Sequence, residues 1–85
     1  MGYHLMMVTI YRARGPRVVI FMDDHEPAHV HVFLDGQLKI NLLGANGGPE
    51  LIWAENMKRD DVRRAMKIVI EQQDHFLALW REIHG

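Results

Sequence analysis

The chain has 85 residues and a formal net charge of −1 at pH 7; 48% of its residues are hydrophobic and 25% are charged. This length predicts a single domain, residues 1–85, with a thin core, and the balanced charge provides no overall positive field for nucleic acid. The chain contains no cysteine and no serine, which excludes disulfides, thiolate zinc sites and a Ser-His-Asp triad. Any chemistry would therefore be acid–base or metal-assisted.

The longest apolar run near the N-terminus is the four-residue segment Leu-Met-Met-Val at residues 5–8. It is too short for a secretory signal or a membrane span. We therefore expect a cytoplasmic protein that does not associate with membranes.

Two strand-like segments open the chain. Residues 5–12 hold β-branched and aromatic side chains, and residues 17–22 are apolar on both faces, as in a central strand. The Gly-Pro turn chemistry between them predicts a β-hairpin. Residues 23–28 then form a polar connector.

A second hairpin is predicted over residues 30–43, because Asp35-Gly36 between two strand-like runs favours a type I′ two-residue turn. In that register His31 faces Ile40 and His29 faces Leu42. The more apolar face of the hairpin would then carry His29, His31, Phe33, Leu38, Ile40 and Leu42. We therefore expect His31 to lie against the core or at its rim.

The remaining segments are a loop at residues 44–49, a short fifth strand at residues 50–54 and a helix at residues 59–84 with an apolar face. Together these segments predict an α+β fold, an antiparallel β-meander of four to five strands with one long C-terminal helix packed on one face. One helix cannot cover both faces of the sheet, and Ile68 and Leu79 widen its apolar arc. We therefore expect a homodimer or a stable partner protein.

Residues 23–32 contain three of the six histidines, His25, His29 and His31. The run His25-Glu26-Pro27-Ala28-His29-Val30-His31-Val32 resembles the signature His-x-Pro-Pro-His-x-His-Val of a small prokaryotic family, the domain of unknown function numbered forty-one-sixty. Phe21, the Asp-Gly hairpin and Trp80 also stand where the resemblance expects them. Ala28 replaces the usual second proline, which loosens the loop but leaves the three histidines in place.

The resemblance implies no established activity, so whether the protein is an enzyme stays open. Genes of the family often neighbour another small gene, and such pairs are commonly regarded as toxin–antitoxin modules. The resemblance therefore implies a binding component of a two-gene, toxin–antitoxin-like module with a small partner protein encoded nearby. The family residues carried over to this chain are His25, Pro27, His29 and His31.

The histidines allow three interpretations. On a strand, His29 and His31 point the same way and could bind a divalent metal such as Zn²⁺, with His25, Asp23 or Asp24 completing the site. No other cofactor is expected.

Two imidazoles could instead act as acid and base in a metal-dependent hydrolase or a ribonuclease that uses His25, His29 and His31. In a ribonuclease, the arginines Arg12, Arg14 and Arg17 would hold the phosphates, although the acidic connector would repel a polyanion. In the third interpretation the rings bond backbone groups of the connector and are structural. A buried His31 would favour binding over catalysis.

Overall fold

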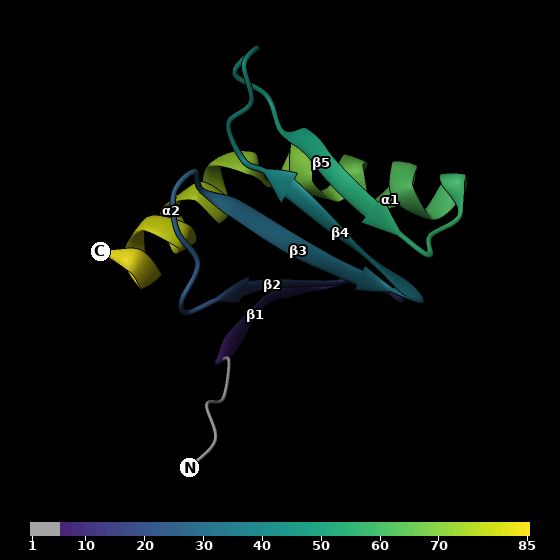
Figure 1. The fold of residues 1–85 in the computed structure, drawn as a ribbon, viewed down its shortest axis with the longest axis horizontal. Coiled ribbons are helices and arrows are strands. Elements are labelled where there is room, and N and C mark those ends of the chain that lie inside the picture. The colour runs from purple at the N-terminus through teal and green to yellow at the C-terminus, as the bar shows by residue number, and fades with distance from the viewer. Residues whose placement is uncertain (1–5) are drawn as a thin grey trace.

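A computed structural model describes residues 6–85 as a five-stranded antiparallel sheet followed by two helices (Figure 1). The fold class predicted from the sequence, an α+β meander, is confirmed. The strands pair in chain order, and each pairs with the next in antiparallel orientation. The elements are β1 (Met7–Arg12), β2 (Arg17–Phe21), β3 (His29–Leu34), β4 (Gly36–Asn41), β5 (Glu50–Glu55), α1 (Arg59–Glu71) and α2 (Gln73–His84). Leu5, expected at the start of the first strand, lies outside the described residues.

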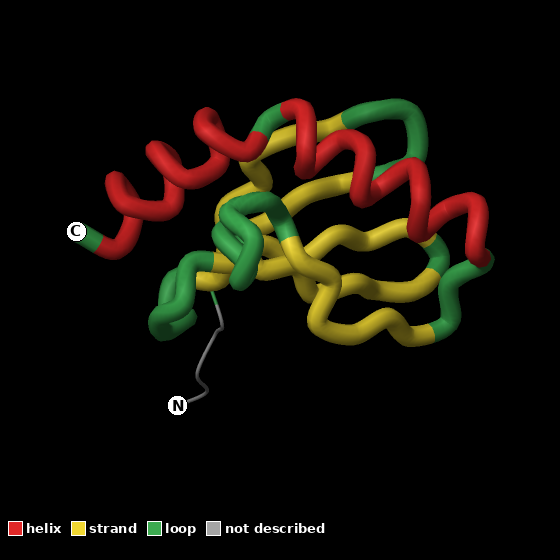
Figure 2. Tube along the Cα trace, turned by 90° about the horizontal axis from the view of Figure 1, so that it is seen from above, coloured by secondary structure: helices red, strands yellow, loops and turns green. Residues whose placement is uncertain are grey.

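Both helices pack on the same face of the sheet, as Figure 2 shows. Cross-strand partners such as Val18 and Val32, Val32 and Leu38, and Val30 and Ile40 point toward this face. The core formed there consists of Val18, Ile20, Val30, Val32, Leu38, Ile40, Leu42, Ala65, Val69, Phe76, Leu77 and Trp80. Alternation along the strands puts their other side chains on the opposite face, which no helix covers in residues 6–85.

The helical segment is broken at Gln72, so the single helix expected over residues 59–84 is two helices. Gln72 has φ −108° and ψ 15°, outside helical geometry, and the chain changes direction there (Figure 2). The side chain of Gln73 donates hydrogen bonds to the carbonyl oxygens of Leu42, at 2.7 Å, and Gly47, at 2.8 Å. These contacts anchor the break to the loop that follows β4. Neither described helix has the length and apolar composition that a membrane crossing requires.

The β3–β4 hairpin differs from the predicted register by one residue. Leu34 pairs with Gly36 and His31 pairs with Lys39, so the expected pairing of His31 with Ile40 is wrong. Of the two residues Asp35 and Gly36, only Asp35 lies in the left-handed region, with φ 60°. Gly36 belongs to β4, where a Cβ would overlap the backbone oxygens of Glu55 and Asn56. Glycine is needed there for close approach of the next strand, not for a positive φ.

A shift of one residue moves the side chains of one strand to the other face relative to its partner. Val30 and Val32, not His29 and His31, therefore share the core face with Leu38 and Ile40. The expectation that His31 lies against the core or at its rim is therefore wrong about the face of the sheet, although the side chain is buried, at 9% exposed. The histidines lie on the face opposite the helices.

Candidate functional site

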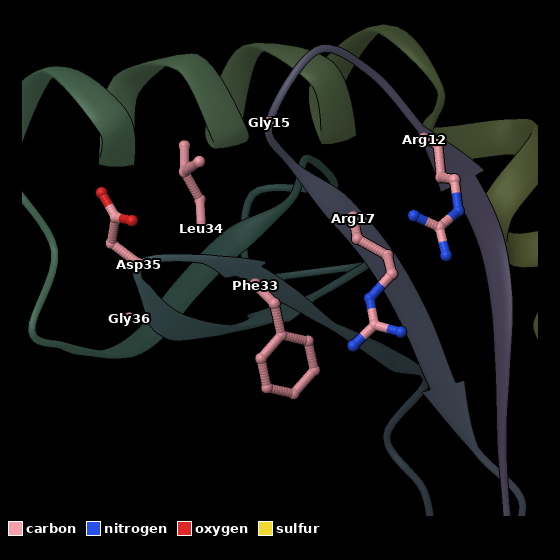
Figure 3. Close-up of a pocket in the computed structure, with 7 residues that line it drawn as sticks. All are labelled: Arg12, Gly15, Arg17, Phe33, Leu34, Asp35 and Gly36. Carbon is pink, nitrogen blue, oxygen red and sulfur yellow. The ribbon is translucent and has the colours of Figure 1, made fainter.

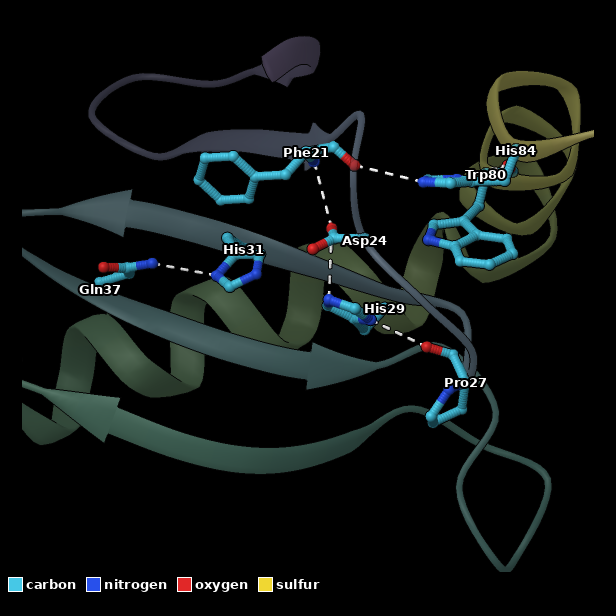
Figure 4. Close-up of polar contacts among 8 residues, drawn as sticks. All are labelled: Phe21, Asp24, Pro27, His29, His31, Gln37, Trp80 and His84. Atoms are coloured by element: carbon cyan, nitrogen blue, oxygen red, sulfur yellow. Dashed lines mark hydrogen bonds and ion pairs between the residues drawn. The ribbon is translucent and has the colours of Figure 1, made fainter. Parts of the chain in front are cut away.

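The connector between β2 and β3, residues 22–28, bends back along the sheet at Asp24. The backbone N–H of Asp24 donates to the carbonyl oxygen of Phe21 at 3.1 Å. The backbone N–H of Phe21 in turn donates to Asp24 Oδ2 at 3.2 Å. These two hydrogen bonds between Phe21 and Asp24 reverse the chain locally. The Asp24 carboxylate therefore points toward the start of β3 (Figure 4).

His29, the first residue of β3, holds the connector at two points. Its Nδ1 lies 2.8 Å from the carbonyl oxygen of Pro27, to which it donates a hydrogen bond, and its Nε2 lies 3.2 Å from Asp24 Oδ2. The side chains of His29 and Asp24 are only 6% and 14% exposed. His29 therefore fits the structural interpretation, in which a histidine ring bonds a backbone group of the connector.

His31 lies two residues further along the same face and is 9% exposed. Its Nδ1 is 3.0 Å from Gln37 Nε2, so Nδ1 accepts a hydrogen bond from the amide in this orientation. The ring packs edge-on against Phe21, at a centroid distance of 4.7 Å, and against Trp53, at 5.9 Å. Side chains from β2 and β5 therefore bury His31 on the face that neither α1 nor α2 covers.

Burial is the main cause of a lowered pKa for His31. The Asp24 carboxylate opposes this shift, while the charges of His29 and Lys39 add to it. A histidine has an ordinary pKa of 6.5, so His31 is neutral at pH 7. A neutral ring matches its contact with the uncharged amide of Gln37.

The structure brings Asp24, His29 and His31 together. Each offers one ligand atom, and these atoms all lie within 4.8 Å of one another. His25 is exposed and lines a neighbouring cavity of about 350 Å³, together with Asp24, Trp80 and His84. Of the connector residues that the sequence offered as a third ligand, Asp24 joins the two strand histidines and His25 does not.

The three N-terminal arginines occupy different places. Arg12 and Arg17 are direct partners across β1 and β2 and line a hollow of about 450 Å³. The Arg17 guanidinium stands over the Phe33 ring, with its Cζ 5.4 Å from the ring centroid (Figure 3). Arg14 does not line this hollow; its carbonyl oxygen accepts a hydrogen bond from the Arg64 side chain.

Four side chains around the histidines were not singled out from the sequence as part of a site: Phe21, Gln37, Trp53 and Trp80. The correct registers of β3, β4 and β5 would have revealed one of them, Trp53. His31 pairs with Lys39, and Lys39 pairs with Trp53, which places Trp53 in the same cross-sheet row. Trp80 comes from α2, and only its place in the family pattern, not any local feature of the sequence, connects it with the motif.

Trp80 is 4% exposed, and its Nε1 has no hydrogen-bond partner among residues 6–85. It lines the cavity beside Asp24, and Figure 4 shows the indole nitrogen on the edge of the ring that faces Asp24. His84 stacks on the indole and approaches the carbonyl oxygen of Phe21 with its Nε2, at 3.2 Å. The C-terminal helix thus closes one side of the connector.

Comparison with family models matches residues 15–81 to a family described as a domain of unknown function, DUF4160. The matched region contains β2 to β5, the connector and nearly all of both helices. Neither the curated proteins nor the solved structures compared with the chain gave a match.

Proposed function

Since the chain belongs to the DUF4160 family, we propose that it is the binding component of a two-gene, toxin–antitoxin-like module whose partner is a small protein encoded nearby. The observation that carries this proposal is the burial of His29 and His31, which are 5% and 9% exposed. Both rings already have hydrogen-bond partners within the domain. This arrangement favours a scaffold role for the motif over proton transfer to a bound substrate.

Apolar side chains on the two edge strands support a protein partner. Met7 and Val8 of β1 are exposed, as are Leu51 and Ile52 of β5. Edge strands with exposed apolar side chains are common places for pairing with a second chain, because their backbone groups lack a neighbour. Ile68 and Leu79, expected to widen the exposed arc of the helix, pack against the core instead, whereas Ile70 is exposed.

The proposal is tested by co-expressing the domain with the neighbouring small gene product and measuring the mass of the purified complex. Ile52→Lys removes apolar surface from the β5 edge and is expected to weaken the complex at least tenfold. Glu50→Lys, on the same exposed strand, changes charge without removing apolar surface and is the matched control. A full-strength complex with Ile52→Lys would exclude the β5 edge, and no complex with the wild type would contradict the partner proposal.

A homodimer is the alternative to a complex with a small partner protein. Analytical ultracentrifugation of the isolated chain at several micromolar concentrations distinguishes the two. A mass of two chains that falls on dilution supports the homodimer. A constant monomer mass for the isolated chain leaves the small partner protein as the binding target.

A ribonuclease or metal-dependent hydrolase using His25, His29 and His31 is the second candidate. The positions of Arg17 and Phe33 favour it. Phe33 lies two residues after His31 on β3, and its cross-strand partner Arg17 lies two residues before Val19, the partner of His31, so a cation lies on the same face of the sheet as the histidine. The discriminating assay is growth on expression of the single gene. Arrest that disappears in a His29→Ala, His31→Ala double variant with intact circular dichroism supports the enzyme, and arrest that persists supports binding.

A further inference from the structure

Asp24, His29 and His31 form a compact group of two imidazoles and one carboxylate. His29 Nε2 and Asp24 Oδ2 are 3.2 Å apart. Zinc binds nitrogen and carboxylate oxygen at about 2.0–2.2 Å, so two ligand atoms of a tetrahedral site are about 3.3–3.5 Å apart. The observed separation therefore admits a metal ion between these two atoms with little movement of either side chain.

Each of the three side chains is also held by a second bond to the protein. His29 bonds the Pro27 carbonyl oxygen through Nδ1, which leaves Nε2 on the side of Asp24. His31 contacts the Gln37 amide through Nδ1, and turning that amide by 180° lets Nδ1 donate to its oxygen and leaves Nε2 free to coordinate. Asp24 accepts the backbone N–H of Phe21. Protein metal sites orient their ligands by this type of outer contact.

Trp80 lies beside the same connector. Its Nε1–H is buried and has no acceptor among residues 6–85, and Figure 4 shows this nitrogen on the edge of the ring that faces Asp24. A buried donor without an acceptor costs stability. Three protein ligands leave a metal with an open position that takes water or another oxygen ligand.

We propose that Asp24, His29 and His31 bind one divalent transition-metal ion of the zinc class, with water or another oxygen ligand in the open position. The mixed nitrogen and oxygen donor set suits Zn²⁺, with Co²⁺ and Ni²⁺ as competitors, and disfavours Ca²⁺ and Mg²⁺, which prefer oxygen ligands alone. This site does not depend on the proposed binding partner. His25 is not a ligand, because it lies outside the group.

The test uses the full, tag-free chain after treatment with chelator, because a histidine tag would itself bind metal. Calorimetric titration with Zn²⁺ is expected to give one ion per chain, and excess Zn²⁺ is expected to raise the melting temperature by several degrees. Co²⁺ is expected to give visible d–d absorption, which a purely structural cluster would not produce. A wild type with no heat, no shift in melting temperature and no cobalt spectrum overturns the proposal, whatever the variants do.

The variants assign the ligands. Asp24→Asn retains the shape of the side chain and is expected to lower the Zn²⁺ affinity at least tenfold, whereas His25→Ala is expected to leave it unchanged within twofold. Gln37→Leu is expected to weaken binding about 10–100-fold, as loss of an outer contact does, with the visible Co²⁺ spectrum retained at saturation. Undiminished binding in Asp24→Asn, or loss of binding in His25→Ala, would overturn the ligand assignment.

Discussion

Replacing His29 with alanine tests how strongly the motif holds the connector. The change removes the hydrogen bond from Nδ1 to the Pro27 carbonyl oxygen, at 2.8 Å, and the contact of Nε2 with Asp24, at 3.2 Å. A neutral hydrogen bond contributes about 1 kcal/mol, and a hydrogen bond to a charged group, which the Nε2 contact with Asp24 forms when Nε2 also carries a proton, contributes about 1.5–3 kcal/mol. We therefore expect His29→Ala to lower the free energy of unfolding by about 3 kcal/mol.

That loss is large for a domain of this size. At about 0.05–0.15 kcal/mol per residue, a chain of this length has a total stability of about 4–13 kcal/mol. A loss of about 3 kcal/mol corresponds to a fall in melting temperature of about 12–24 °C in a small domain. The assay is urea unfolding followed by circular dichroism, with chelator present in every sample so that bound metal makes no contribution.

Two further variants make the result specific. His25→Ala removes an exposed histidine from the same connector and is expected to leave the unfolding midpoint unchanged. A double-mutant cycle of His29→Ala with Asp24→Ala isolates the contact between these two side chains, with an expected coupling of about 1–3 kcal/mol. A stability loss below about 1 kcal/mol in His29→Ala would refute the reasoning, since even one of the two bonds contributes that much.

Burial lowers the pKa of His31 below its ordinary value of 6.5, so the unfolded chain binds the proton first as pH falls. The free energy of unfolding should therefore decrease below about pH 6.5 until the folded-state pKa is reached, and His31→Gln should flatten this slope; an equal slope in both proteins would contradict it. Gly36→Ala places a Cβ against the backbone oxygen of Glu55 and should cost about 1–3 kcal/mol in urea unfolding. Gly48→Ala, where a Cβ meets nothing within 4 Å, is the control that should remain near the wild type, and equal stability of the two variants would argue against this close approach.

Element order was predictable because each strand and the helical segment carry their own periodicity and turn chemistry. The hairpin register was not, because Asp35-Gly36 is compatible with both a two-residue turn and the tighter pairing observed. The choice depends on the approach of β5 to Gly36, a contact between residues distant in the chain. The break at Gln72 likewise depends on tertiary contacts, those of Gln73 with Leu42 and Gly47.

The histidine motif was recognisable as the candidate site, and its two strand histidines do converge. The choice of Asp24 over His25 follows from the reciprocal backbone bonds with Phe21, which no pattern of residue types indicates. The contribution of Trp80 comes from a helix about fifty residues later in the chain. The sequence was therefore sufficient to identify the two strand histidines, but not the contacts that Asp24, Gln37 and Trp53 make with them.

Strand β3 has a consequence for the mutations that the domain can accept during evolution. Val30 and Val32 are fully buried in the core, while His29 and His31 alternate with them on the opposite face. A single-residue insertion or deletion within this strand would exchange the two sets of side chains, so the core and the histidine pair would be lost together. Length variation in related chains is therefore expected in the connector, and not between His29 and Val32.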